Sequence, residues 1–386
     1  MNEEKKIRVK NAILGALVAD SASLGLHWIY NQRQINNLEA ITPEFHAPNK
    51  NDYENGVGFF AHKNKKVGDF SHYGEQLMVL LRSLVSNNGV YDKTHYQDSF
   101  REHFGYGGAY VGYIDHPTRD TLDNITRAEI QALEDSKKIP FDGDENTQHM
   151  MITKVLANMK QVKGQKLYEK VEEAVRTTHD DDVMVEYSFK LIQAMEGVNG
   201  FYGANDEQLP AISKLPALVG MYAGKQELEE VVESSVRVTN NNDFAVEFGK
   251  AAAYILEAVI QNDDSKNAIE TSYKNTSPAI RKLIDEVLSH KDEETITVSS
   301  KIGTSCNLVL GIPIIVHNLI TSESYTEAIR KNIYVGGDSC GRSILLGAVL
   351  GVSNGRGNEN GIPSEWIEKL NQKEEIYELI EKLVNF

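Results

Sequence analysis

The sequence contains few cysteines, few prolines and an excess of acidic over basic residues. Its two cysteines, Cys306 and Cys340, are too few for a disulfide framework in a chain of 386 residues. The formal net charge is −16, which repels phosphate backbones and anionic membrane surfaces. We therefore expect neither nucleic acid nor a membrane as partner, and we expect a cytoplasmic protein.

Long uninterrupted apolar runs are scarce as well. The most apolar stretch near the N-terminus covers residues 12–26, but Asp20 interrupts it and Glu3 and Glu4 precede it. These acidic residues argue against a secretion signal. We expect no segment near the roughly 18 apolar residues that a helix needs to span a bilayer.

Helical periodicity dominates the rest of the chain. Four segments carry apolar residues at spacings of three and four, the pattern of an amphipathic helix. They are Leu77, Leu80, Leu81 and Leu84; Val171, Ala174 and Val175; Phe248, Ala252, Ile255, Leu256 and Val259; and Ile376, Leu379, Ile380 and Leu383. Residues 295–299 are the one plausible strand and could equally be a linker. The polar stretch from about 42 to 70 is long for a loop, and loops of that length are often functional.

An internal repeat connects two predicted helix pairs. Residues 175–187 parallel residues 236–248, and each copy places a polar, threonine-rich turn before a helix that Asp or Asn can cap. Two interpretations stay open. The turns repeat ordinary cap chemistry, or one or both line a central cleft.

The first candidate cluster surrounds Asp20. Small residues on both sides of Asp20 predict a closely packed helix and a buried carboxylate, which must be paired, hydrogen-bonded or metal-bound. His27, Trp28 and Tyr30 then bring a titratable ring and two aromatic faces to the end of this helix. The alternatives are a structural carboxylate and an ordinary core histidine.

Two further clusters follow the long loop. His72, Tyr73, Glu75 and Gln76 lie in the first turn of a predicted helix, where backbone N–H groups favour anions. Glu75 could simply complement the helix dipole. Residues 104–121 interleave aromatic residues with glycines and include Tyr113 and Asp115, a pattern that suits a wall for a planar ligand or irregular surface packing.

The fourth cluster is the turn Gly336–Arg342, which precedes a helix rich in small residues. A glycine pair delivers Asp338 to the helix N-terminus, as a plain N-cap or as part of a pocket floor. Cys340 lies beside Arg342. Its thiol pKa is lowered if the helix N-terminus and Arg342 favour the thiolate, whereas a buried, inert cysteine is the other interpretation.

These clusters together resemble the ADP-ribosylglycohydrolase superfamily. The resemblance is carried, in order, by Asp20, the repeated threonine turns, the Gly336–Asp338 turn, and Gly347 and Gly351. It implies an all-α fold, a single-domain orthogonal helical bundle of the ADP-ribosylglycohydrolase type over residues 1–386, with its core at about 10–370. It also implies a cleft formed by both ends of the chain.

The resemblance implies two magnesium ions, but this chain departs from the pattern that holds them. Ser71–Gly74 stands where the superfamily has Thr-Asp-Asp-Thr, and Asp338–Gly341 replaces the acidic Asp-Thr-Asp-Thr end of its second motif. Asp338 is the carboxylate that remains, and too little charge is left to dehydrate and hold two Mg²⁺ ions. We expect no cofactor and no metal; Asp20 and Asp338 would be the ligands if an ion were held.

The departures themselves resemble the branch that includes the J-type crystallins and selenoprotein J. The matching segments are His27–Tyr30, Tyr73–Gln76, Ser305–Cys306 with Pro313, and Gly337–Cys340. The resemblance also implies that the catalytic glutamate, which the hydrolases carry just after the first motif, is replaced around His27 in this chain. It supplies no reaction for this branch.

We expect a hydrolase-like enzyme that acts on a small polar metabolite, such as a nucleotide or a ribosyl derivative, by metal-independent acid–base chemistry. His27 or Glu75 would be the general acid or base, and Asp20 and Asp338 would orient the reacting groups. An oxocarbenium-like state also needs Glu75 or Asp338 to face the ligand. The predicted ligand-binding residues are Trp28, Tyr30, His72, Tyr73, Gln76, Tyr113, Asp115, Cys340 and Arg342.

Two other functions stay open. One is a non-catalytic, crystallin-like structural or ligand-binding protein, which the negative charge suits. The other is a magnesium-dependent ADP-ribosylglycohydrolase that uses Asp20, Glu75 and Asp338 as ligands. If Asp20, His27, Glu75 and Asp338 meet in one accessible pocket, the enzyme is favoured; separate, satisfied burial argues against it. The sequence leaves the oligomeric state open.

Overall fold

The structure is a computed structural model that describes residues 1–386 except 55, 160–161, 163–164, 196–199 and 262–263. Pairing between extended segments in the described residues is limited to four isolated bridges, so the fold is all-α, as predicted. The α-helices are α1 (Glu3–Ser23), α2 (Gln32–Leu38), α3 (His72–Ser86), α4 (Lys93–Phe104), α5 (His116–Lys137), α6 (Glu145–Met159), α7 (Gln165–Arg176), α8 (Asp182–Ala194), α9 (Leu215–Tyr222), α10 (Leu228–Thr239), α11 (Asp243–Gln261), α12 (Ser265–Ser272), α13 (Pro278–Leu288), α14 (Thr295–Ile302), α15 (Leu308–Thr321), α16 (Tyr325–Val335), α17 (Ser339–Asn354), α18 (Ser364–Ile367) and α19 (Lys373–Val384).

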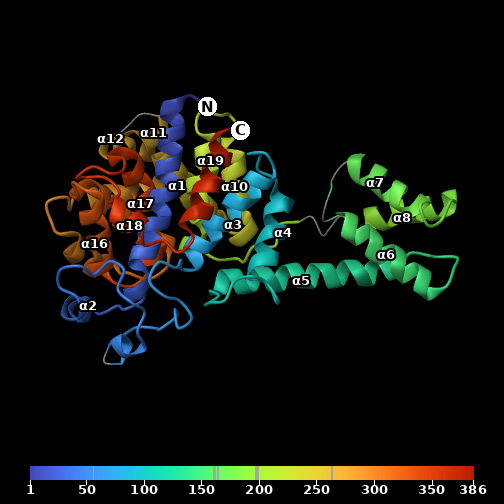
Figure 1. Cartoon of the computed structure of the whole chain (residues 1–386), viewed down its shortest axis with the longest axis horizontal. Coiled ribbons are helices and arrows are strands. Elements are labelled where there is room, and N and C mark those ends of the chain that lie inside the picture. The colour runs from blue at the N-terminus through green and yellow to red at the C-terminus, as the bar shows by residue number, and fades with distance from the viewer. Residues whose placement is uncertain (55, 160–161, 163–164, 196–199, 262–263) are drawn as a thin grey trace.

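The two ends of the chain meet at the centre of the main body, where α1 packs against α17 (Figure 1). Glycines allow the two backbones to touch. A Cβ atom at Gly15 would lie 2.3 Å from the carbonyl oxygen of Gly347, and one at Gly351 would lie 2.4 Å from that of Asn11. The small-residue helix after Asp338 is therefore buried between its neighbours, as the sequence predicted.

Helix α1 also corrects an expectation. Together with the short turn that follows it, residues 3–26 are long and apolar enough to span a membrane by length and composition alone. In the structure 94% of that apolar window is buried inside the protein. Its apolar side chains pack against α9 and α17, so core packing accounts for the composition of this helix.

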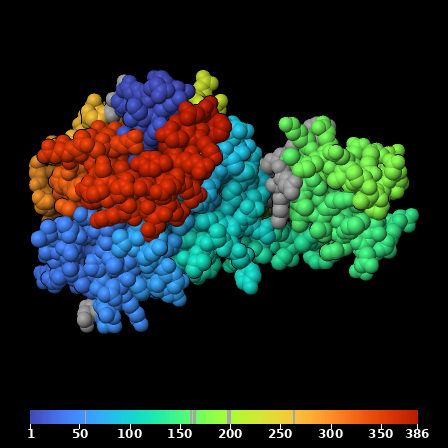
Figure 2. Space-filling model, in the orientation of Figure 1, coloured from blue at the N-terminus to red at the C-terminus, as the bar shows by residue number. Residues whose placement is uncertain are grey.

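A second hydrophobic cluster lies apart from the main core. Helix α5 leads away from the main body to α6, α7 and α8, whose apolar side chains pack on one another (Figures 1 and 2). The main core is built from the remaining helices. Residues 175–187 of the repeat lie in this projecting group, while residues 236–248 lie in the main body.

The repeat has the same construction in both places. Arg176 pairs with Glu172 and with Asp182 across the turn between α7 and α8. Arg237 does the same with Glu233 and Asp243 between α10 and α11. Asp181 and Asn242 cap the second helices, as expected.

The predicted strand at residues 295–299 is wrong, because this segment begins helix α14. Its β-branched residues favour strands in isolation. However, Thr295, Val298 and Ser299 are buried, and their spacing of three and four is that of one helix face. Packing of that face against α15 and α16 overrides the local preference. The four predicted amphipathic segments lie in α3, α7, α11 and α19.

Candidate functional site

Two hydrogen bonds join the segment after α1 to the turn before α17. The Trp28 amide donates to the Gly337 carbonyl, and the Gly337 amide donates to the Ile29 carbonyl, both at 2.8 Å. Gly336 and Gly337 have φ of 76° and 61°, a region that glycine enters at little cost. Trp28 has φ of 65°, which is uncommon for a bulky residue. This clamp brings His27 next to Asp338.

Asp338 is fully buried and accepts hydrogen bonds from three parts of the chain. Its Oδ1 accepts from the Gly341 amide, as an N-cap does, and from His27 Nε2, both at 2.9 Å. Its Oδ2 accepts from the Tyr73 hydroxyl at 2.5 Å. Burial alone would raise the pKa of Asp338, but the bonds from His27 and Tyr73 hold it below the usual value. The carboxylate is therefore ionised and saturated.

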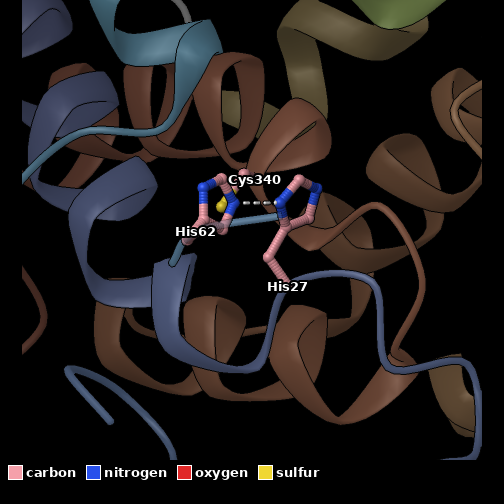
Figure 3. A group of neighbouring side chains, drawn as sticks. All are labelled: His27, His62 and Cys340. Carbon is pink, nitrogen blue, oxygen red and sulfur yellow. Dashed lines mark hydrogen bonds between the residues drawn. The ribbon is translucent and has the colours of Figure 1, made fainter. Parts of the chain in front are cut away.

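His27 has both ring nitrogens engaged. Because Nε2 donates to Asp338, Nδ1 carries the lone pair and accepts from Nε2 of His62 at 2.7 Å (Figure 3). Burial lowers the pKa of His27, and Asp338 opposes that shift only in part. His27 is thus a neutral imidazole, buried completely, and it does not reach solvent.

Asp20 is buried as predicted, and the start of α3 satisfies it. Its Oδ2 accepts from the Ser71 amide at 2.8 Å, and its Oδ1 accepts from the Ser71 hydroxyl. Gly74 leaves room for this carboxylate, because a Cβ atom there would lie 2.4 Å from Oδ2. Burial raises the pKa of Asp20 to about 7, although the bonds from Ser71 lower it.

Asp20→Asn is expected to change how stability depends on pH. The folded pKa of about 7 lies above the ordinary 3.8, so between these values the folded state binds more protons than the unfolded state. The contribution of Asp20 to stability is fully present below about pH 4 and is lost as pH rises through 7, at a cost on the order of 4 kcal/mol. An amide can present the hydrogen-bonding pattern of the protonated acid to Ser71.

Urea unfolding at several pH values measures this effect. As pH rises from 4 to 8, the unfolding free energy of the parent should fall relative to that of Asp20→Asn. A difference between the two that stays constant across this range would show that Asp20 is ionised throughout.

Glu75 pairs with two basic side chains. Its Oε1 lies 3.0 Å from Lys65 Nζ, and its Oε2 lies 3.0 Å from His103 Nε2. Burial favours the neutral acid, but His103 and Lys65 together hold the pKa of Glu75 below its ordinary value. The expectation that Glu75 titrates near working pH is therefore not met, because hydrogen bonds from His103 and Lys65 favour its charged form.

Arg342 and Cys340 face the interior rather than an opening. The Arg342 guanidinium donates to the Asn332 side chain and to the carbonyls of Gly336 and Thr304, so it holds the glycine turn in place. Burial raises the pKa of the Cys340 thiol well above its usual value. The thiolate interpretation of Cys340 is thus wrong, because desolvation outweighs Arg342 and the helix N-terminus.

Four of the predicted ligand-binding residues carry buried polar atoms that lack a hydrogen-bond partner within the described residues. The atoms are Trp28 Nε1, His72 Nδ1 and Nε2, Gln76 Oε1 and Asp115 Oδ2. His72 Nε2 and Asp115 Oδ2 lie 3.1 Å apart, within ion-pair distance but without the alignment of a hydrogen bond. Buried polar groups are nearly always satisfied, so unpaired atoms gathered in one place indicate a ligand or bound water.

The elements that carry these atoms explain their orientation. His72 and Gln76 are four residues apart on α3 and therefore share one face. The Gln76 amide nitrogen donates to Thr118 on α5 at 3.2 Å, which leaves Oε1 unpaired. Asp115 is the N-cap of α5: its Oδ1 accepts from the Thr118 amide at 2.9 Å, and its Oδ2 is left for His72.

Aromatic rings cover this group of atoms. The Trp28 ring lies 5.1 Å from Tyr113 and 6.0 Å from Phe59, and His72 lies 5.8 Å from Tyr113. Tyr113 and Tyr30 are partly exposed, whereas Trp28 is 7% exposed. Tyr113 of the aromatic, glycine-rich segment 104–121 therefore lies beside this group, whereas Tyr106 of the same segment is fully exposed.

Sequence reasoning missed several residues of the site. His62 and Lys65 lie in the predicted functional loop, but a single histidine or lysine in a polar segment shows no spacing that would single it out. Asp206 was also missed. It accepts from Asn240 in the second repeat turn, and burial raises its pKa to about 6. Asp115 lies near enough to raise that pKa further, so the turn after α10 borders the site.

The site does not fit the magnesium pair that the resemblance implies. Both oxygens of Asp338 and both oxygens of Asp20 already accept hydrogen bonds, and Glu75 is held by Lys65 and His103. The donors around Asp338 are imidazole and phenol groups, whereas Mg²⁺ requires oxygen ligands in an octahedral array. In the structure these residues form a hydrogen-bonded network rather than a set of open oxygen ligands.

Comparison with known proteins decides the family. The family model described as ADP-ribosylglycohydrolase matches residues 1–198 and 192–386, which together cover the whole chain. The chain belongs to the ADP-ribosylglycohydrolase family. A solved structure titled "ADP-ribosylglycohydrolase-related protein complex" superposes with a TM-score of 0.60 over 100% of this chain and 99% of the other, at 14% identity. This likeness shows that the fold is shared.

Two curated relatives are crystallins. Crystallin J1A of Tripedalia cystophora is 27% identical over 390 residues, which cover 99% of this chain and 98% of the crystallin. Crystallin J1B of the same organism is 25% identical over 404 residues, with the same coverage. This ADP-ribosylglycohydrolase family member is thus similar along its full length to the J-type crystallins, as its departures from the magnesium motifs indicated.

Proposed function

We propose that this family member is an enzyme that binds a small polar metabolite of the ribosyl or nucleotide class and acts on it without a magnesium pair. The proposal rests mainly on the unpaired polar atoms of Trp28, His72, Gln76 and Asp115. They offer an indole donor, an amide acceptor, a carboxylate oxygen and an imidazole in one place. Hydroxyl groups of a sugar can both donate to and accept from such a set.

His72 and Asp115 form the reactive pair in this proposal. Asp115 Oδ2 lies beside His72 Nε2 and orients the ring, which leaves Nδ1 free for the ligand. Burial alone would raise the pKa of Asp115, but His72 and Thr118 hold it below the usual value, so the carboxylate stays charged. It can stabilise positive charge at a sugar carbon while His72 donates a proton to the leaving group. Water then supplies the new C–O bond, and its proton returns to His72.

The buried network lies behind this pair. Tyr73 packs its ring 4.0 Å from that of His72, and the His27 ring lies 6.2 Å from His72. Asp338 binds both Tyr73 and His27, so it fixes two of the rings that surround His72. In this account His27, Asp20 and Asp338 position the site, and His72 touches the ligand. Tyr113, whose ring lies beside that of His72, follows the glycine-rich segment of residues 105–112.

The test is the release of ADP-ribose from an ADP-ribosylated substrate in the presence of EDTA. We expect turnover by the parent chain, and a fall of about 100-fold or more for His72→Phe and Asp115→Asn, since positioned acid–base groups contribute at least that much. His95→Phe on α4 is the control, because within the described residues the His95 ring bonds to Ser83 and Ser86. Full turnover by both site variants would refute the assignment.

A non-catalytic role is the second candidate. It is favoured by the complete burial of Asp20, His27 and Asp338, and by the full-length similarity to crystallins. The four predicted catalytic residues do not share an open pocket, although three of them meet around the start of α3. Binding of ADP-ribose without turnover of any ADP-ribosylated substrate would support this second candidate.

A further inference from the structure

The two histidines and the buried cysteine form a cluster that the proposed acid–base chemistry does not use. Nitrogen atoms of His27 and His62 and the sulfur of Cys340 all lie within 4.8 Å of one another (Figure 3). The rings are inclined by only 22°, so they nearly share a plane and face each other through their nitrogens. All three side chains are at most 1% exposed.

We propose that His27, His62 and Cys340 form a binding site for one thiophilic metal ion, Zn²⁺ or Cu⁺. Two imidazoles and one thiolate are the ligands that zinc and monovalent copper prefer, and they suit magnesium poorly. This site goes beyond the proposed function, and it differs from the carboxylate-rich magnesium centre in both ligands and chemistry.

Asp338 orients His27, one of the three proposed ligands, through a hydrogen bond. A metal-binding histidine usually donates its other ring N–H to a carboxylate, which fixes the tautomer and orients the ring. His27 does this, because Nε2 donates to Asp338 at 2.9 Å and Nδ1 faces His62. The lone pair that an ion requires is therefore already directed at the centre of the cluster.

His62 can release the proton that now links the rings. Its Nε2 donates to His27, whereas its Nδ1 is buried and has no hydrogen-bond partner within the described residues. Binding an ion at Nε2 moves the ring proton to Nδ1, and the Cys340 thiol loses its proton to solvent as the metal–sulfur bond forms. The two nitrogens are 2.7 Å apart and must separate to about 3.3 Å around zinc at its usual bond length.

The ion would join three distant parts of the chain. His62 belongs to the polar loop, His27 follows α1, and Cys340 begins α17. A metal bound there ties the loop to both ends of the chain. Since the site binds the folded state, we expect a higher melting temperature and slower proteolysis of residues 42–70 in the loaded protein.

The full chain is first unfolded in the presence of a chelator, so that burial of the site cannot block entry of an ion. It is then refolded with Zn²⁺, with Cu⁺ under reducing conditions, or with Mg²⁺. We expect one equivalent of Zn²⁺ or Cu⁺ per chain after desalting, and no Mg²⁺. Co²⁺ should give the intense thiolate charge-transfer absorption of a cobalt–sulfur bond. His62→Gln and Cys340→Ser should each lose the bound equivalent and the rise in melting temperature.

His46→Gln is the matched control, because His46 lies in the same loop and pairs with Asp52. It should bind the ion as the parent does. Asp115→Asn, which alters the proposed ligand site and none of the three metal ligands, should still bind one equivalent of the ion, so failure of this inference and failure of the proposed function are distinguishable. Absence of a bound ion in the parent would overturn the proposal, and so would equal binding by the parent, His62→Gln and Cys340→Ser.

Discussion

Gly347→Val is expected to destabilise the fold severely. Even the first side-chain atom has no room, because a Cβ at Gly347 would lie 2.4 Å from the Gly15 carbonyl oxygen and 2.5 Å from the Ala19 Cβ. Two helix backbones would have to move apart along the central contact. Overpacking usually costs about 1–3 kcal/mol, and we expect the upper end or more here because backbone atoms cannot yield.

Urea unfolding followed by circular dichroism measures the loss. Gly347→Ala should show a smaller decrease in the unfolding free energy than Gly347→Val. Ser353→Ala, in the last turn of the same helix, is the control, since its hydroxyl has no partner within the described residues. If Gly347→Val unfolds at the urea concentration of the parent, α1 and α17 do not pack as closely as described.

Asp338→Ala should produce a loss of at least the same size. The substitution removes the acceptor of His27, Tyr73 and the Gly341 amide, and it leaves three buried donors without partners. Breaking a buried charged network by removing one member typically costs about 3–5 kcal/mol. Asp338→Asn keeps one side-chain oxygen that can still accept from some of these donors. Its cost in unfolding free energy should therefore be smaller, about 1–2 kcal/mol.

Thermal unfolding of the two variants, with Tyr73→Phe alongside, tests this ranking. We expect the melting temperature to fall most for Asp338→Ala and less for Asp338→Asn and Tyr73→Phe. Equal melting temperatures for Asp338→Ala and the parent would mean that the network does not stabilise the folded state.

Much of the fold could be predicted from local pattern. The long helices repeat apolar residues at three and four, and glycines at 15, 347 and 351 mark where two backbones touch. The short helix α14 was missed because its β-branched residues favour a strand. The buried face that shows it to be a helix consists of only three residues, Thr295, Val298 and Ser299. The projecting group of α6–α8 was not foreseen, since helix periodicity does not say which core a helix joins.

The site was predicted in part, and its hydrogen bonding was not. The similarity of both chain ends to the family placed Asp20, His27 and Asp338 together. Whether one of these side chains can reach a ligand depends on its hydrogen-bond partners, and those partners are distant from it in the sequence. Glu75 is held by Lys65 and His103, and Asp115 rather than Asp338 retains an oxygen without an aligned hydrogen bond. No spacing in the sequence encodes those pairings.

The central claim is that a polar, metal-free site between α3 and α5 binds a ribosyl or nucleotide metabolite. Calorimetric titration of ADP-ribose, once in EDTA and once in Mg²⁺, tests it most directly, with Gln76→Leu as the site variant and Gln97→Leu on α4 as the matched buried control. We predict the same affinity in both buffers for the parent. For Gln76→Leu we predict binding weaker by about tenfold or more, because the ligand loses one buried acceptor. Binding that requires Mg²⁺, or that Gln76→Leu leaves unchanged, would contradict the account.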